Sequence, residues 1–377
     1  MEVVLSKNLQ QIREKIDLLD QELQDKLNQR AQLAQQVAEV KLTEAAEGEE
    51  VLFYRPEREA EVLRTVMDRN QGPLDAQEMA RLFREIMSAC LALEQPMKIA
   101  FLGPEGTFTQ TASLKHFGHS VNTIPCSTIT DVFRDVETDN CDYGVVPVEN
   151  STEGVITHTL DMLVDSPLKI CGEVSLRIHH YLMSQEDKLR AITKVYSHQQ
   201  SLAQCRSWLD QNLPNAERIA VNSNAEASRL ASLEKGAGAI ASDSVAAIYQ
   251  LNLLANKIED QADNTTRFII LGKQDVDETR AAIDSSDDSS ELNKTSLMLI
   301  SANESGALFN LLKPLAENNL SMTRIESRPS KSGLWQYVFF IDIDGHISNP
   351  EVAKALEEIN NKSSLMKILG SYPKAVL

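Results

Sequence analysis

The chain has 377 residues, of which 42% are hydrophobic, and this length predicts two or three domains with buried cores. Its formal net charge of −18 and its pI of about 4.9 argue against a nucleic-acid partner and against an anionic membrane surface. The five cysteines form no C-x-x-C pair and no apolar run is long enough to cross a bilayer, so we expect no disulfide framework, structural zinc or membrane span. We therefore expect a cytoplasmic protein in which the site for any anionic ligand concentrates its own cations.

The first domain, residues 1–96, is predicted to be all-helical. Residues 8–42 contain no glycine or proline, and their apolar residues recur at spacings near three and four. A helix of this length cannot bury its own apolar stripe, so it needs partners. A second helix is predicted to begin near Pro56, and a third follows the capping residue Asp75.

Several polar residues fall on helix faces that should be buried. Arg30 lies in the apolar register of the first helix and Lys41 at its edge, while Cys90 and Glu94 lie one turn apart on the third helix. A buried cation needs a counter-anion, which favours a site for an anionic ligand. The pattern fits equally well the edge of a coiled coil whose long side chains reach water, so the residues alone leave both interpretations open.

From residue 97 to residue 272 strands alternate with polar turns and helices, which predicts a two-lobed α/β domain with parallel sheets. The stretch DNTTRFIIL (263–271) should be the closing strand of this set. Residues 273–293 are acidic and serine-rich, and they predict a flexible linker. Residues 294–377 show the order β-α-β-β-α-β, which is the ferredoxin-like α+β plan.

Residues 8–95 resemble the all-helical chorismate mutase domain. The resemblance implies a site made of Arg13, Arg30, Lys41, Arg58, Glu59, Cys90 and Glu94. Two chains intertwine in that family, and Arg13 would serve the partner's site. The reaction needs no nucleophile, so Arg13 and Arg30 would clamp the two carboxylates of chorismate while Lys41 and a donor from the third helix stabilise the ether oxygen. Glu94 stands where some relatives have glutamine, and it would have to be protonated to donate a hydrogen bond.

Four stretches of the central region together resemble prephenate dehydratase: GPEGTF (103–108), VPVENSTEG (146–154), YSHQQSLAQC (196–205) and TTRF (265–268). That family has two lobes like those of periplasmic solute-binding proteins, with the active site in the cleft. The resemblance implies that Thr266 contacts or protonates the departing hydroxyl of prephenate, and that Arg267 binds a carboxylate or braces the strand. The other polar residues expected there are Glu149, Asn150, Ser151, Ser197, Gln204 and, at a helix N-terminus, Thr107. Singly, such serines and threonines are more often caps, and His198 fits a proton donor or a turn residue.

Residues 295–377 resemble the ACT module, a small regulatory domain that binds amino acids. In the dehydratase family the segments GAL (306–308) and ESRP (326–329) mark phenylalanine binding, so the implied effector-binding residues are Gly306, Ala307, Leu308, Glu326, Ser327, Arg328 and Pro329. Without the family, an Arg-Pro pair at the end of a strand is typical of edge protection.

Nearly the whole chain thus resembles the bifunctional chorismate mutase/prephenate dehydratases. The resemblance implies conversion of chorismate to prephenate and then to phenylpyruvate, inhibition by L-phenylalanine, and a homodimer or a higher assembly. It implies no metal, nucleotide or redox cofactor, and the sequence contains no phosphate-binding loop or dinucleotide motif. Two alternatives stay open, namely a dehydratase acting on arogenate and a two-lobed amino-acid sensor without catalysis.

Overall fold

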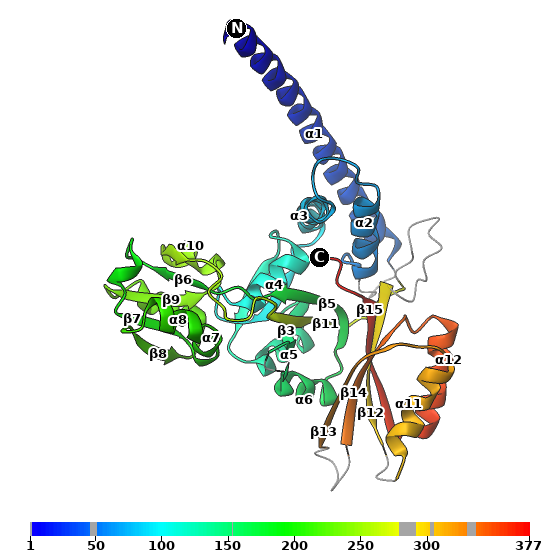
Figure 1. The fold of residues 1–377 in the computed structure, drawn as a ribbon. Helices are drawn as coiled ribbons and strands as arrows, with labels where there is room; N and C mark the ends of the chain where they lie inside the picture. Colours follow the sequence, from blue (N-terminus) through cyan, green and yellow to red (C-terminus); the bar gives the residue numbers. More distant parts are fainter. Residues whose placement is uncertain (1, 46–50, 153, 279–291, 302–304, 330–336) are drawn as a thin grey trace.

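The structure is a computed structural model, and it describes residues 2–45, 51–152, 154–278, 292–301, 305–329 and 337–377. It contains a helical N-terminal domain, a two-lobed central domain and a C-terminal module that lies against one of the two lobes (Figure 1). Within these ranges, no helix combines the length and the apolar character that crossing a membrane requires.

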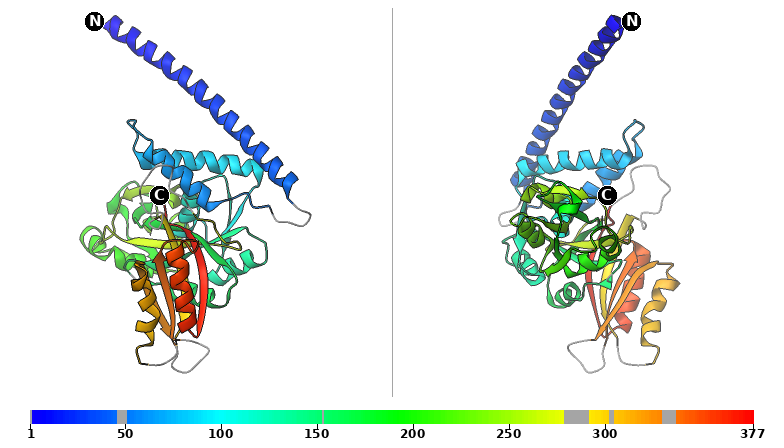
Figure 2. Two further views of the ribbon diagram at one scale, coloured as in Figure 1. Left: turned by 90° about the vertical axis from the view of Figure 1, so that its right-hand side faces the viewer. Right: turned by 60° about the vertical axis from the view of Figure 1, so that its left-hand side comes forward.

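The N-terminal domain consists of α1 (Glu2–Glu44), α2 (Pro56–Asp68) and α3 (Ala76–Glu94). The predicted helix starts are confirmed, because Pro56 opens α2 and the Asp75 side chain accepts a hydrogen bond of 2.9 Å from the amide of Gln77. The N-terminal part of α1 projects away from the rest of the chain in every view (Figures 1 and 2). Its apolar stripe is therefore exposed; Leu23, for example, is 59% exposed.

The first lobe is built on a sheet with the strand order β2-β1-β3-β11-β5, and β4 pairs with β3. Its strands are β1 (Lys98–Leu102), β2 (Asn122–Cys126), β3 (Tyr143–Asn150), β4 (Gly154–Val155), β5 (Lys169–Arg177) and β11 (Thr265–Gly272). Its helices are α4 (Phe108–Phe117), α5 (Ile129–Glu137) and α6 (Thr157–Asp165). Apolar side chains of α5 and α6 pack with those of the sheet to form the core of this lobe.

The second lobe is built on a sheet with the order β10-β6-β9-β7-β8. Its strands are β6 (Tyr181–Ser184), β7 (Lys194–His198), β8 (Glu217–Val221), β9 (Ala237–Ala241) and β10 (Asn252–Ala255). Its helices are α7 (Gln199–Gln204), α8 (Arg206–Asn212), α9 (Asn224–Ala231), α10 (Ser244–Tyr249) and the 3-10 turn η1 (Leu189–Ala191). Two apolar clusters form its core, one on each side of the sheet strands β7 and β9.

The chain crosses between the lobes twice, after β5 and again before β11. The expectation of parallel sheets is met by β1 with β2 and β3 and by β7 with β8 and β9, but not by β11, which runs antiparallel to both β3 and β5 and lies between them. The reason is that β5 leads out of the first lobe and β11 leads back into it. A strand that returns from the second lobe beside the outgoing strand must run in the opposite direction.

The C-terminal module has the predicted order of elements, β12 (Asn293–Ile300), α11 (Ala307–Glu317), β13 (Met322–Pro329), β14 (Tyr337–Asp344), α12 (Pro350–Lys362) and β15 (Leu365–Pro373). Its antiparallel sheet has the order β13-β14-β12-β15. The two helices cover one face of this sheet. Residues of the other face, among them Leu369 and Phe340, belong to the core of the first lobe.

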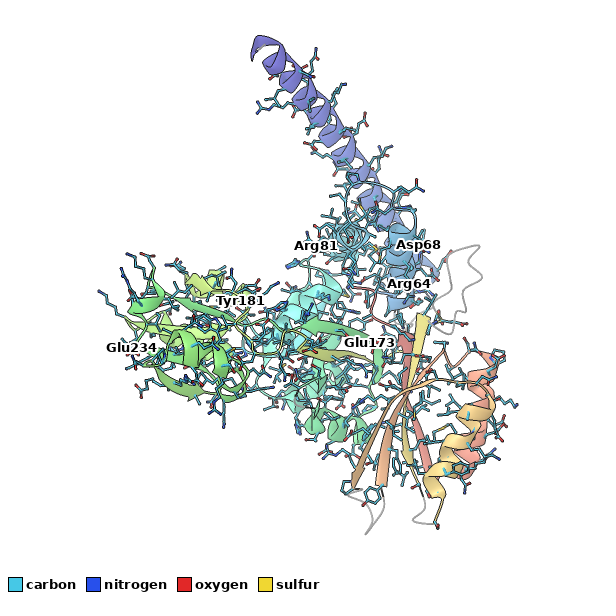
Figure 3. All side chains as sticks on the ribbon, viewed as in Figure 1. Arg64, Asp68, Arg81, Glu173, Tyr181 and Glu234 are labelled. Atoms are coloured by element: carbon cyan, nitrogen blue, oxygen red, sulfur yellow. The ribbon has the colours of Figure 1, made fainter. Side chains whose placement is uncertain are left out.

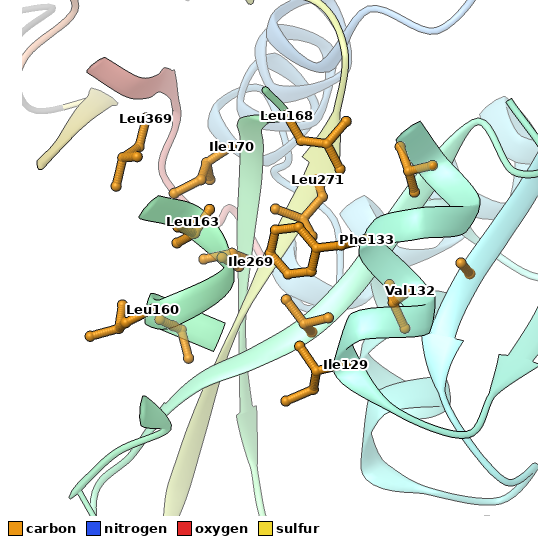
Figure 4. Packing of buried hydrophobic residues seen from close by; sticks show 14 of the residues in the cluster. Ile129, Val132, Phe133, Leu160, Leu163, Leu168, Ile170, Ile269, Leu271 and Leu369 are labelled. Atoms are coloured by element: carbon orange, nitrogen blue, oxygen red, sulfur yellow. The ribbon is translucent and has the colours of Figure 1, made fainter. Parts of the chain in front are cut away.

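This shared core joins the C-terminal module to the first lobe. Figure 4 shows Leu369 of β15 beside Ile170 and Leu163 of the first lobe. The two backbones come so close that a Cβ atom at Gly370 would overlap the backbone of Ile170. The module is therefore packed as part of the same body and not tethered loosely.

The start of the predicted linker is also packed. Val276 is buried, Asp277 forms an ion pair of 2.9 Å with Arg55, and Glu278 accepts a hydrogen bond of 2.8 Å from Ser348. Residues 273–278 thus connect all three domains. Residues 279–291 of the predicted flexible segment lie outside the described residues, and its predicted last residue, Asn293, is already the first residue of β12.

Candidate active sites

A cavity of about 290 Å³ lies in the cleft between the two lobes of the central domain. The first lobe contributes Thr107, Asn150 and Thr266, and the second contributes Gln204 and Asn224. Three helices begin at this cavity, since residues at the starts of α4, α7 and α9 line it. The free amides of a helix start attract anions, so this geometry suits a ligand with carboxylate groups.

Thr266 lies at the centre of a hydrogen-bond chain. Thr266 on β11 is paired with Asn150 on β3, and the Asn150 amide donates to Thr266 Oγ1 at 2.8 Å and to Asn264 Oδ1 at 2.9 Å. Since the Thr266 oxygen accepts from Asn150, its own proton is not used in this bond and can be donated elsewhere. The prediction that Thr266, Asn150, Gln204 and Thr107 meet in the cleft agrees with these positions.

The chain of hydrogen bonds continues to His180, a residue that the sequence reasoning missed. Gln204 Oε1 accepts from the Asn264 amide at 3.3 Å and lies 2.8 Å from His180 Nε2, so Nε2 must carry the proton. His180 is 1% exposed, and burial lowers its pKa, which keeps the ring neutral. Asn264 could have been suspected because it directly precedes TTRF; the sequence carries no comparable signal for His180.

The cavity is free of formal charge. No lysine, arginine, aspartate or glutamate is among the described residues that line it. The concentrated cations expected at a site for an anionic ligand are thus not found among the described lining residues. At the start of α4, the Thr107 hydroxyl donates to Leu102 O at 3.0 Å and does not cap the helix, so it leaves the first amides of that helix available.

Three other predicted residues support the cavity, and Ser197 and Ser151 do so without lining it. Ser197 is fully buried, and its one hydroxyl proton is shared between Ile240 O at 2.8 Å and Asn224 Oδ1 at 2.9 Å, which orients Asn224. Ser151 accepts from the Thr265 amide at 3.0 Å. His198 lines the cavity and its side chain accepts from the Gln200 amide at 3.4 Å, so it caps α7 as a turn residue would.

Arg267 and Glu149 face away from the cavity and are not among the described residues that line it. For Arg267 this favours the second of its two expected roles, which is to brace the strand. Successive side chains of a strand point to opposite faces, and Thr266 already faces the cleft. Arg267 instead braces the strand through Glu173 at 2.9 Å and Asp342 at 2.6 Å. Glu149 lies 3.3 Å from Arg324 of the C-terminal module. In Figure 3, Glu173 lies where the sheet of the first lobe approaches this module.

A second candidate site lies in the N-terminal domain. Burial raises the pKa of Glu94, and the nearby charges of Lys41 and Arg30 oppose this rise, so the three side chains are close enough to interact. Lys41 Nζ also donates to Leu52 O at 2.9 Å. Cys90 is buried on the same helix as Glu94, one turn earlier.

The other mutase residues are not brought to this group within one chain. Arg13 lies nearer the N-terminus of α1, about 25 Å along the helix from Arg30 at 1.5 Å per residue. Arg58 is exposed and pairs with Glu61 at 3.1 Å. Glu59 forms a largely buried ion pair of 3.2 Å with Arg84. The expectation that Arg58 and Glu59 join Arg30 and Lys41 is therefore not met in the single chain.

The implied effector residues lie in two places on the C-terminal module. Gly306, with φ of +79°, precedes α11, and Ala307 and Leu308 form the first turn of that helix. Residues 326–329 lie on the edge strand β13, where Arg328 forms an ion pair of 3.4 Å with Asp161 on α6. Arg328 thus contacts the first lobe, which the motif had not suggested.

Together, the fold and the two sites define a class of protein: a two-lobed cleft enzyme joined to a helical domain with clustered cations and to a ferredoxin-like regulatory module. Residues 12–95 match the chorismate mutase type II family, residues 99–276 the prephenate dehydratase family and residues 295–361 the ACT domain. The chain is 53% identical over 370 residues to the bifunctional chorismate mutase/prephenate dehydratases of Stutzerimonas stutzeri and of Pseudomonas aeruginosa, with 98% of each chain covered. The chain belongs to the family of bifunctional chorismate mutase/prephenate dehydratases.

Solved structures agree with this assignment. The prephenate dehydratase of Arthrobacter aurescens in complex with L-Phe is 33% identical, with a TM-score of 0.64, and the match covers 73% of this chain and 89% of that one. The resemblance drawn from the four central motifs and the two ACT segments is confirmed at the level of the family. The alternative of an amino-acid sensor without catalysis is not favoured.

Proposed function

We propose that the uncharged cleft dehydrates and decarboxylates prephenate, with Thr266 donating to the departing hydroxyl. The observation that carries the proposal is the Asn150–Thr266 hydrogen bond of 2.8 Å at the wall of this cavity. The C–O bond breaks as the hydroxyl leaves with a proton as water, and the C–C bond to the ring carboxylate breaks as carbon dioxide leaves. The electrons of the C–C bond enter the ring, which becomes aromatic.

The absence of charge in the described lining fits this chemistry. A cation next to the ring carboxylate would stabilise the charged group that must be lost as neutral carbon dioxide. The side-chain carboxylate persists and can be held by the amides at the helix starts. Arogenate carries an ammonium group, and no aspartate or glutamate among the described lining residues could pair with it, so prephenate is the favoured substrate.

In the N-terminal domain, Arg30, Lys41 and a protonated Glu94 would act on chorismate. Arg13 would complete the site of a second copy. Two observations support such a dimer: the exposed apolar stripe along α1 and the distance of about 25 Å along that helix between Arg13 and Arg30. The five cysteines are free and buried, which suits a cytoplasmic homodimer.

In the C-terminal module, L-phenylalanine would bind between the start of α11 and the edge strand β13. The supporting facts are the left-handed Gly306 at the open start of a helix and the relative whose structure contains L-Phe. The edge strand β13 has one unpaired side, which a second copy of the module could cover.

The test is to supply chorismate to the wild type and to Thr266→Ala, and to follow prephenate and phenylpyruvate separately. We expect the variant to accumulate prephenate, with a dehydratase kcat lower by about 100-fold or more and an unchanged mutase rate. Thr265→Ala is the matched control, because the neighbouring hydroxyl donates to Asp263 O at 3.1 Å outside the cavity. Equal formation of phenylpyruvate by Thr266→Ala and the wild type would refute the proposed role.

A further inference from the structure

The paired strands β3 and β11 contact the cleft cavity on one face and the C-terminal module on the other. On one face Thr266 is paired with Asn150, and both line the cleft cavity. On the opposite face the next pair, Arg267 and Glu149, is directed to the C-terminal module. Thr266 and Arg267 are neighbours on one strand, with side chains on opposite faces. A displacement of Arg267 therefore also moves the backbone that carries Thr266.

Arg267 is the centre of an interdomain ion cluster, which we define as Glu149, Glu173, Arg267, Lys294, Arg324 and Asp342. The guanidinium of Arg267 donates to Asp342 Oδ2 at 2.6 Å, to Glu173 Oε2 at 2.9 Å and to the hydroxyl of Tyr372 at 3.2 Å. Its side chain is 15% exposed and that of Asp342 only 4%. Asp342 and Tyr372 belong to the C-terminal module, whereas Arg267 and Glu173 belong to the first lobe.

The charges in this cluster are well compensated. Burial alone would raise the pKa of Asp342, but the guanidinium groups of Arg267 and Arg324 outweigh it and hold that pKa below its ordinary value. Asp342 Oδ1 also accepts from Ser296 at 2.6 Å. Asp342 is therefore a fixed anion, and removing its charge would leave the guanidinium of Arg267 only partly paired in a buried position.

A second contact acts on the partner strand. Arg324 Nε of β13 lies 3.3 Å from Glu149 Oε2 of β3, the residue that precedes Asn150. The pairing of β3 with β11 shifts register between Arg267 and Phe268, so the ladder is interrupted directly after the Arg267–Glu149 pair, one pair beyond Thr266–Asn150. At such a place side-chain contacts have more influence on the position of the backbone than they have in a regular ladder.

We propose that Arg267 and Glu149 are positioning residues of the dehydratase site, held by Asp342 and Arg324 of the C-terminal module. The module thereby sets the distance between Thr266 and Asn150, and a ligand bound to the module changes the dehydratase rate by shifting these two contacts. This inference rests on the proposed dehydratase function. It assigns to the module a role in the basal reaction as well as in the response to L-phenylalanine.

The experiment compares Asp342→Asn with Asp344→Asn in the full chain. Asp344 lies on the same strand, and its ion pair of 2.7 Å is with Lys374 and not with β11, so it is the matched control. Dehydratase kcat and KM are measured with prephenate, the mutase rate with chorismate serves as the folding control, and inhibition is titrated with L-phenylalanine. We expect Asp342→Asn to lower the dehydratase kcat about tenfold or more, with KM and the mutase rate unchanged within about twofold, and to weaken inhibition.

Asp344→Asn should leave the dehydratase kcat unchanged, and Asp342→Glu should recover part of the loss seen with Asn. A wild-type kcat and a wild-type response to L-phenylalanine in Asp342→Asn would overturn the inference. A parallel loss of mutase rate and dehydratase kcat in both asparagine variants would overturn it too, because it would show a merely structural role. Failure of the wild type to convert prephenate would instead refute the proposed function itself.

Discussion

Glu94 should make the mutase rate fall as the pH rises. The carboxyl must be protonated to donate to the ether oxygen, and an ionised carboxylate can only accept. Burial raises the pKa of Glu94, and Lys41 and Arg30 oppose that rise. The protonated fraction therefore falls as the pH rises through this pKa, and the mutase kcat/KM should fall with it.

The magnitude follows from titration of a single group. Above the pKa, each pH unit lowers the protonated fraction about tenfold, which is about 1.4 kcal/mol of lost transition-state stabilisation. Over two pH units above this pKa, the rate should therefore fall about 100-fold. Glu94→Gln supplies a permanent donor of similar size, so its profile should be flat over this range.

The assay follows loss of chorismate from pH 5 to pH 9 in buffers of constant ionic strength. Glu78→Gln is the matched control, because Glu78 lies on the same helix and pairs with Arg81 on its exposed side. It should keep the wild-type profile. A wild-type profile without a falling limb, or a falling limb that survives in Glu94→Gln, would refute the reasoning about Glu94.

Two further predictions concern the second copy and the effector. If Arg13 serves the partner's site, Arg13→Ala and Arg30→Ala subunits, each inactive as mutases, should recover about one quarter of wild-type activity when mixed, since half of the dimers would be mixed and each of these would have one intact site. No recovery in a mixture that gel filtration and mass spectrometry show to contain mixed dimers would place both arginines in one site of one chain. Arg328→Ala should abolish the heat of L-phenylalanine binding in calorimetry. Asp161→Asn, which removes the 3.4 Å ion pair of Arg328 with α6 but keeps Arg328, should retain it; loss in both variants would assign Arg328 to the interdomain contact and not to the effector site.

Local signals predicted the elements well. The start of α2 at Pro56, the start of α3 after Asp75 and the order of the six elements in the C-terminal module were all predicted correctly. Residues close together in the sequence determine each of these features, so a single sequence is enough to predict them. The position of β11 could not be predicted in the same way. Whether a strand is central or at an edge, and parallel or antiparallel, depends on the path of the chain through the second lobe, which no local pattern records.

Within the cleft, the motifs predicted which segments meet but not which side chains point inward. The alternation of a strand already implied that Thr266 and Arg267 face opposite ways, so the placement of Arg267 was available from the sequence. The role of His180 could not be predicted from the sequence, because it arises from a contact of 2.8 Å with Gln204 on α7 of the second lobe. Glu59 was assigned from the motif, and its pairing with Arg84 depends on how α2 packs on α3.

The two sites differ in charge, and the difference has a chemical reason. In the mutase reaction both carboxylates of chorismate are still present in the product, so Arg13 and Arg30, the cations proposed to clamp them, would hold them throughout without opposing any step. In the dehydratase reaction one carboxylate is expelled as a neutral molecule, and a cation beside it would stabilise the substrate more than the transition state. The described lining of the cleft accordingly offers helix starts, amides and the Thr266 hydroxyl. A chain of net charge −18 can thus bind two dianions in succession, first with cations and then with oriented dipoles.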